Sequence, residues 1–131
     1  MLEGFKIVNL TIGLPYVSFT NNGVTFSKSI LIKMDQPEYV VLMMNEQQKK
    51  VAIQICEKDT PGAAKFAKDK KVLNVRWNNK DFLNTVSRLM DWNLKEDGYR
   101  VLGEWYEQEK VMIFDLSEAE KINGRNNESD D

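Results

Sequence analysis

The stretch YVVLMMNEQQKKVAIQI, residues 39–55, decides the fold class of this chain of 131 residues. An apolar run opens the stretch, an alternating run closes it, and the polar residues 45–50 lie between them. Two such runs joined by a polar loop predict a β-hairpin. The first run is apolar throughout, so its strand is predicted to lie centrally in a sheet with both faces covered. In the second run, Val51, Ile53 and Ile55 share one face.

Upstream of this hairpin, the sequence predicts extended segments and one short helix. Residues 5–12, 16–19 and 24–26 are apolar or β-branched and are separated by proline, asparagine and glycine, which break regular structure. Ser27 can cap a helix, and Pro37 ends it. The apolar residues of this helix are Ile30, Leu31 and Met34.

Downstream, the sequence predicts a loop, a strand and an amphipathic helix. The charged residues 57–71 form the loop, with one helical turn at 63–67, and residues 72–77 form the strand. Asn78 can cap the helix, and Asp81 in its first turn is favourable to the helix dipole. The apolar stripe of this helix consists of Phe82, Leu83, Val86, Leu89 and Met90.

Residues 99–106 and 110–116 predict a second hairpin near the end of the chain. Because hairpins dominate and the strand–helix–strand alternation of a parallel sheet is missing, the predicted class is α+β. The expected architecture is a mostly antiparallel sheet or partial barrel with two helices, formed by residues 1–119 as a single domain. Residues 120–131 are polar and acidic, so we predict a disordered acidic tail there.

The residue types that the chain lacks exclude most catalytic chemistry. The sequence contains no histidine, a single cysteine (Cys56) and no glycine-rich phosphate loop. Histidine general bases, histidine metal ligands, thiolate metal clusters and phosphate-binding loops are therefore excluded. Carboxylate or lysine chemistry stays open, but no pair stands out among the 20 acidic residues. We expect a protein that is not an enzyme and that binds neither a cofactor nor a metal.

Three features bear on the compartment. Residues 1–6 contain no basic region followed by a long apolar stretch, so no signal peptide is predicted. The longest apolar run, residues 39–44, is too short to cross a bilayer, which takes about 20 residues. A lone cysteine cannot form an internal disulfide. We therefore expect a cytoplasmic protein that makes no contact with a membrane.

Positive charge gathers between residues 65 and 77, in a chain whose formal net charge is −2. Only Asp69 opposes this cluster, and Phe66 and Trp77 adjoin it. Lysines neutralise phosphates and exposed rings stack on bases, so the cluster predicts a nucleic-acid-binding site. Its residues are Lys65, Lys68, Lys70, Lys71, Arg76 and Trp77. The alternative is a solvated loop whose two rings are packed in the core.

Two more aromatic side chains lie next to each other in the closing hairpin. Because successive side chains of a strand point to opposite faces, either Trp105 or Tyr106 must point away from the core. An outward ring can be a binding contact, an edge contact or a dimer surface. The sequence therefore leaves a protein partner and a homodimer open beside nucleic acid.

Two resemblances to known families add expectations. Residues 24–42, followed by the hairpin to Ile55, resemble the half-unit of AbrB/MraZ-type transcription factors, which interleave two such units into a DNA-binding dimer. Over more of the chain, the plan resembles the PrgU-like group of small proteins from Gram-positive conjugative elements. This second resemblance rests on residues 26–55, 82–92 and 111–119.

The PrgU-like resemblance implies a PUA-like fold, which is a pseudo-barrel common in RNA-binding proteins. It also implies a role in limiting production of a surface adhesin after transcription. Together with the basic cluster, it makes our leading hypothesis a non-enzymatic regulator from a mobile genetic element that binds nucleic acid, with RNA favoured over DNA. The alternative is a protein-interaction accessory module that does not bind nucleic acid.

Overall fold

The structure, a computed structural model, describes residues 2–5, 13–67 and 74–122 of the chain. Within these residues it contains nine strands, two α-helices and one short 3-10 helix. The strands are β1 (Tyr16–Thr20), β2 (Gly23–Phe26), β3 (Tyr39–Asn45), β4 (Lys50–Ile55), β5 (Ala63–Lys65), β6 (Val75–Trp77), β7 (Gly98–Tyr106), β8 (Val111–Asp115) and β9 (Glu120–Ile122). The helices are α1 (Lys28–Lys33), α2 (Lys80–Met90) and η1 (Leu116–Glu118).

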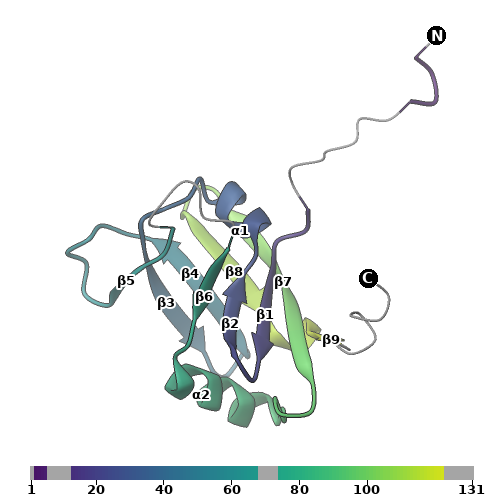
Figure 1. Cartoon of the computed structure of the whole chain (residues 1–131). Helices are drawn as coiled ribbons and strands as arrows, with labels where there is room; N and C mark the ends of the chain where they lie inside the picture. Colours follow the sequence, from purple (N-terminus) through teal and green to yellow (C-terminus); the bar gives the residue numbers. More distant parts are fainter. Residues whose placement is uncertain (1, 6–12, 68–73, 123–131) are drawn as a thin grey trace.

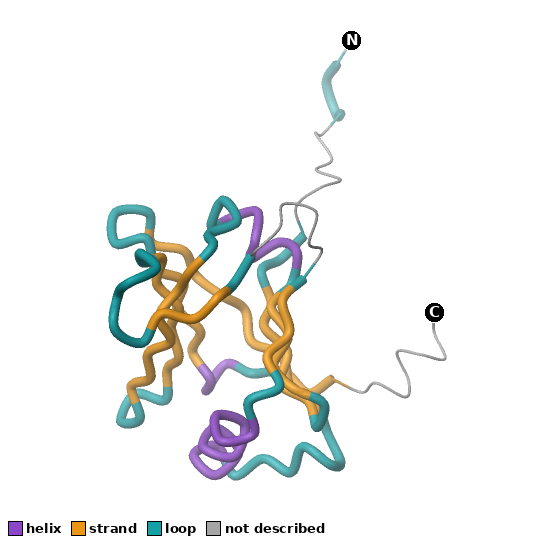
Figure 2. Tube along the Cα trace, turned by 60° about the vertical axis from the view of Figure 1, so that its left-hand side comes forward, coloured by secondary structure: helices purple, strands orange, loops and turns teal. Residues whose placement is uncertain are grey.

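The strands form one curled sheet, in which every pairing among the described residues is antiparallel. The strand order is β5-β3-β4-β8-β7-β1-β2-β6, with β9 paired to β7. Because the sheet curls, its two edge strands approach each other. The ring of Phe66, which follows β5, lies 6.0 Å from the ring of Trp77 in β6. Figure 1 shows α1 and α2 at opposite ends of the curl, and Figure 2 shows the strands wrapping around its interior.

Strand β7 belongs to both halves of the curled sheet. Its residues 99–102 pair with β1, whereas residues 103–106 pair with β8. At the change of partner, the N–H of Gly103 donates to the carbonyl oxygen of Pro15 over 2.8 Å. A Cβ at Gly103 would lie 2.6 Å from Sδ of Met112 and 2.7 Å from Cε1 of Phe114. Glycine at this position therefore makes room for two buried side chains.

One hydrophobic core fills the curl, and aromatic rings make up its centre. The ring of Phe26 in β2 lies 4.9 Å from Trp77, 5.2 Å from Phe66 and 6.2 Å from Phe114. Ile30 and Leu31 of α1 and Met34 at its C-cap, the apolar residues that the spacing predicted, are all buried. Tilted ring pairs of this kind add to the stability gained from apolar burial.

The expected fold class is confirmed, since the protein is α+β with a curled antiparallel sheet and two helices. Both predicted hairpins are present, as β3 with β4 and as β7 with β8. Helix α1 begins directly after Ser27, which is at the predicted N-cap position, but the Ser27 side chain makes no capping hydrogen bond. No helix in the described part of the chain has the length and apolar character that crossing a membrane requires.

Three details of the secondary structure differ from the prediction. Strand β3 lies next to the short edge strand β5, and Met43 on its outer face is 40% exposed, so the strand is not covered on both faces. Residues 63–65 form β5 instead of a helical turn, because they pair with β3. The cap of α2 is Asn79, whose side-chain oxygen accepts from the N–H of Phe82 over 2.9 Å, and not Asn78.

The first three residues of the predicted disordered acidic tail, 120–122, are part of the sheet. Glu120–Ile122 form β9 and pair with residues 98–100 of β7. Glu120 also accepts a hydrogen bond from Nε of Arg100 over 2.9 Å. The folded domain therefore includes residues 120–122. Residues 123–131, and residues 6–12 of the first predicted strand, lie outside the described residues.

Candidate nucleic-acid interface

The structure describes three of the six residues predicted to bind nucleic acid. Lys65 ends β5 and is exposed, Arg76 lies in β6 and is exposed, and Trp77 ends β6 half-buried. Lys68, Lys70 and Lys71 lie outside the described residues. Strands β5 and β6 stand at opposite ends of the strand order, so it is the curling of the sheet that brings this segment together in space.

The two rings beside the basic cluster have different environments. Phe66 is only 5% exposed and packs edge-on against Phe26, so it is a core residue and not a stacking platform. Trp77 also packs edge-on against Phe26, with ring centroids 4.9 Å apart, but it keeps part of its surface accessible. Of the two alternatives for these rings, the core position is confirmed for Phe66, whereas Trp77 lies at the boundary between core and surface.

A cleft of about 470 Å³ lies where the two edges of the sheet face each other, and Trp77 is in its wall. We call it the seam cleft. One side is formed by Leu42, Gly62 and Ala64 from β3, β5 and the loop before β5. The other side and the base are formed by Arg76, Trp77, Asn78, Asn79 and Phe82. The seam cleft therefore combines apolar walls with a cation and two amide side chains.

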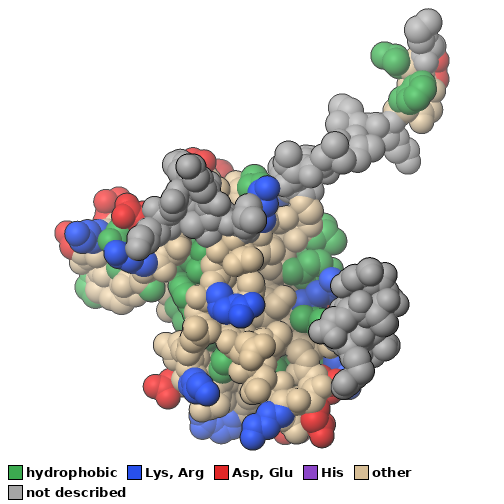
Figure 3. Space-filling model, in the orientation of Figure 1, with side chains coloured by type: hydrophobic (Ala, Val, Ile, Leu, Met, Phe, Trp, Pro, Cys, Tyr) green, Lys and Arg blue, Asp and Glu red, His purple; other side chains and the backbone are tan. Residues whose placement is uncertain are grey.

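None of these residues lining the seam cleft is acidic. In the part of the chain that the structure describes, Arg76 forms no ion pair, unlike Arg100 with Glu120, Lys110 with Glu107 and Lys121 with Asp97. Figure 3 shows Lys and Arg side chains over β6 and α2. The acidic side chains visible in this view lie toward the edges of the molecule. An anion approaching the cleft therefore meets a cation that forms no ion pair with any described residue.

The side chain of Arg76 is held in place across two strands. Its Nε donates to Oγ1 of Thr25 over 3.3 Å, and the two residues are register partners in the pairing of β6 with β2. This bond uses only Nε, and the two terminal nitrogens of the guanidinium make no hydrogen bond to the described residues. Arginine is suited to phosphate because its donors form a planar fork.

Sequence reasoning missed two amides and included one lysine that lies elsewhere. Asn78 and Asn79 line the seam cleft, but on sequence alone an asparagine before a helix indicates a cap. Lys65 is not a lining residue: it alternates with Ala64, which faces the cleft, and therefore points to the other face of β5. The signal that could have found the amides is the run Arg76–Asn79, a cation, a ring and two amides in succession.

The aromatic pair in β7 behaves as the alternation predicts. Tyr106 is 40% exposed, whereas Trp105 packs against the core. Both polar groups already have partners, because Oη of Tyr106 donates to Glu104 and Nε1 of Trp105 donates to Glu107, each over 2.8 Å. The bond to Glu104 raises the pKa of Tyr106, and the bond from Lys110 lowers the pKa of Glu107. This surface carries mixed charge, in contrast to the seam cleft.

Comparison with known proteins assigns no function to this cleft. In the described part of the chain, no group of histidine, cysteine or carboxylate side chains is arranged to hold a metal ion. No family model matches the chain, and neither a curated protein nor a solved structure matches it.

Proposed function

We propose that this protein is a non-enzymatic regulator of gene expression that binds single-stranded nucleic acid, RNA in preference to DNA, at the seam cleft. The observation that carries the proposal is the composition of the cleft wall, in which Arg76, Trp77, Asn78 and Asn79 adjoin one another without an acidic residue. Arginine binds phosphate, a tryptophan ring contacts a base, and amides supply both donors and acceptors to base edges.

Size supports a single strand over a duplex. A cleft of about 470 Å³ between two strand edges can admit a base that has left its stack. Proteins that read RNA by sequence mostly bind such unstacked bases in loops and single-stranded segments. Trp77 is held at a fixed angle by Phe26 and Phe66, so little ordering is needed when a base contacts it.

The resemblance to the PrgU-like group supplies the class of target. In this proposal the protein binds transcripts of a mobile genetic element, including one that encodes a surface adhesin, and limits their expression. The protein-interaction module remains the competing function, with the exposed outer face of β7 around Leu102 and Tyr106 as its contact surface.

The proposal is tested by fluorescence anisotropy with a labelled single-stranded RNA of mixed sequence. A single strand of DNA and an RNA duplex of the same sequence serve as competitors. Arg76→Ala is expected to weaken RNA binding about fivefold at roughly 0.1 M salt, because one phosphate contact changes the logarithm of affinity by about 0.7 per decade of salt. Lys33→Ala removes the same charge beside Asp35 and Glu107, and is expected to leave binding unchanged.

The outcome against the proposal is a well-folded protein that binds none of the three nucleic acids at low salt. In that case the protein-interaction module is the better account. Equal loss of affinity in Arg76→Ala and Lys33→Ala would show only a diffuse attraction to positive charge, and it would remove the seam cleft as the site.

A further inference from the structure

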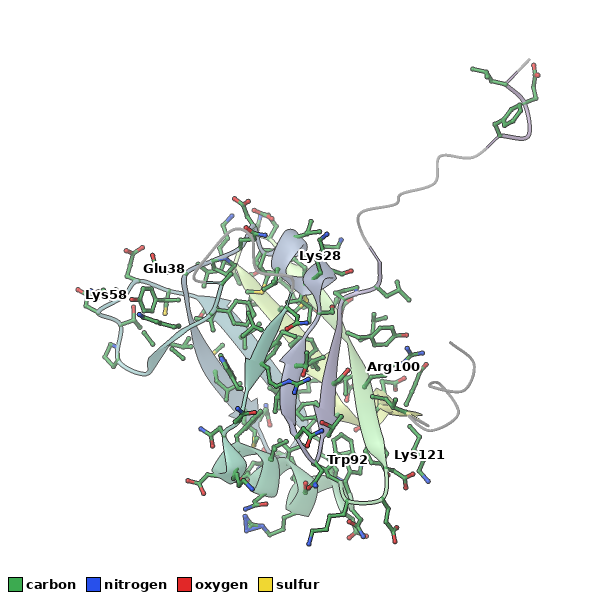
Figure 4. All side chains as sticks on the ribbon, in the orientation of Figure 1. Lys28, Glu38, Lys58, Trp92, Arg100 and Lys121 are labelled. Carbon is green, nitrogen blue, oxygen red and sulfur yellow. The ribbon has the colours of Figure 1, made fainter. Side chains whose placement is uncertain are left out.

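A second hollow lies on the other flank of α2 and has a volume of about 530 Å³. Helix α2 contributes Lys80, Asn84 and Ser87 to its lining. The segment after the helix contributes Trp92, Asn93 and Lys95, and the turn between β1 and β2 contributes Asn21. We call it the Trp92 hollow; Figure 4 shows Trp92 at the end of the sheet where α2 lies.

The Trp92 hollow has the same chemical character as the seam cleft. Its lining holds two lysines and three asparagines but no acidic residue. Leu83 and Leu94 add apolar surface. The ring of Trp92 stacks on Tyr99 with centroids 4.2 Å apart and planes 6° apart, and it also contacts Phe19. Trp92 is therefore held in position by these ring contacts. The lysine and asparagine side chains of the lining are the groups that can bind a ligand.

The turn between β1 and β2 lies beside both hollows. Asn21 in this turn lines the Trp92 hollow. Gly23, two residues later, lies so close to β6 that a Cβ would be 2.7 Å from the carbonyl oxygen of Trp77 and 2.9 Å from Oδ1 of Asn78. On the helix side, Phe82 lines the seam cleft and its neighbour Leu83 lines the Trp92 hollow. The two hollows thus flank α2, and amide side chains lie between them.

We propose that the Trp92 hollow is a second subsite, which binds the nucleotides next to the one in the seam cleft. This inference rests on the proposed function. Lys80 and Lys95 take the phosphates of the strand, and Asn84 and Asn93 bind its bases. Positive charge separated along a groove is how proteins follow a single-stranded backbone over several nucleotides. The proposed contact is thereby extended from one base in the seam cleft to several consecutive nucleotides of the strand.

The position of Lys80 supports a role in binding over a role in stability. Lys80 is the first residue of α2, and Asn79 is its cap. The N-terminus of a helix carries partial positive charge, so a cation there is unfavourable to the helix. Removing this charge is therefore expected to weaken ligand binding without lowering the free energy of unfolding.

The test compares two double variants that lose the same charge. Lys80→Ala/Lys95→Ala alters the Trp92 hollow. Lys33→Ala/Lys58→Ala is the control, because Lys33 lines a different hollow with Asp35 and Glu107, and Figure 4 shows Lys58 far from Trp92. The probe is a labelled oligouridylate of about 12 nucleotides, a length in the range that single-strand-binding folds cover.

We expect the Lys80→Ala/Lys95→Ala variant to bind this probe roughly 25-fold more weakly at about 0.1 M salt, with a log–log salt slope flatter by about 1.4. The control variant is expected to bind as the unchanged protein does. If the unchanged protein binds and Arg76→Ala weakens binding, but the two double variants have equal affinity, then the Trp92 subsite is wrong and the seam cleft stands. If the unchanged protein binds mixed-sequence RNA but not this probe, the Trp92 subsite is wrong and the seam cleft stands; if it binds neither at low salt, both proposals are wrong.

Discussion

At the scale of single residues, Trp77 belongs to the core and to the candidate site at once. Its ring packs edge-on against Phe26 and Phe66, and another part of it lines the seam cleft. Truncation to alanine therefore removes packing and a base contact together. A loss of RNA binding in Trp77→Ala cannot by itself be assigned to either.

Two other substitutions at Trp77 separate these roles. Trp77→Phe keeps a ring, whereas Trp77→Leu keeps apolar bulk without a ring. If a base stacks here, Trp77→Leu should bind single-stranded RNA weaker by about 1–3 kcal/mol, and Trp77→Phe by less. Both variants should unfold at nearly the same urea concentration, and Trp77→Ala should cost about 2–3 kcal/mol, below the range for fully buried tryptophan. Equal RNA affinity of the leucine and phenylalanine variants would show that Trp77 serves the core only.

At the scale of elements, the two ends of α2 differ in how well their charges suit the helix. Asp81 lies in the first turn, where the helix dipole favours a negative charge. Asp91 is the C-cap in the left-handed conformation with φ 59°, where the dipole disfavours it. The same residue type thus stabilises one end and destabilises the other.

The same substitution at both ends is predicted to have opposite effects. Asp81→Asn should lower the free energy of unfolding by about 0.3–1 kcal/mol at low ionic strength, because it removes a favourable charge. Asp91→Asn should raise it by a similar amount, since asparagine also tolerates the left-handed conformation. Urea unfolding at low and high salt measures the free energy of unfolding of each variant. High salt should reduce the effect of each substitution, because it screens the charges. A shift of the same sign in the two variants would contradict the dipole argument.

At the scale of the whole molecule, strand β9 helps to complete the sheet. Strand β9 pairs with the start of β7, opposite β1, and thereby covers an edge that would otherwise be exposed. Two ion pairs reinforce it, Arg100 with Glu120 at 2.9 Å and Lys121 with Asp97 at 3.6 Å. Exposed pairs of this kind contribute about 0–1 kcal/mol each, so backbone pairing is the main stabilising effect.

Two truncations test where the folded domain ends. A chain ending at Ala119 lacks β9, whereas a chain ending at Ile122 retains it. The shorter chain should melt several degrees below the longer one, because about 1 kcal/mol corresponds to roughly 3–6 °C at this size. Glu120→Gln in the full chain isolates the ion pair and should shift the melting temperature less. Equal melting temperatures of the two truncated chains would mean that β9 contributes nothing to stability.

The sequence by itself determined the class of the fold and the hairpins. Two apolar runs on either side of a short polar loop form a hairpin through contacts between neighbours in the sequence. The hairpins of residues 39–55 and 99–116 were therefore predicted correctly. The position of α1 also followed from local signals, since the serine before it and the proline after it mark its limits, although Ser27 makes no side-chain capping bond. Arg76 and Trp77 were found as candidates from local charge and ring content alone.

Only the tertiary structure decided how the edges of the sheet meet, and the site depends on that meeting. Leu42 and Asn78 are far apart in the chain, and they share the seam cleft because the sheet curls until β5 approaches β6. Short strands such as β5 and β9 form by pairing with distant partners, so their own residues give no signal. Local sequence patterns record propensity and periodicity, whereas closure of a sheet is set by packing across the whole core.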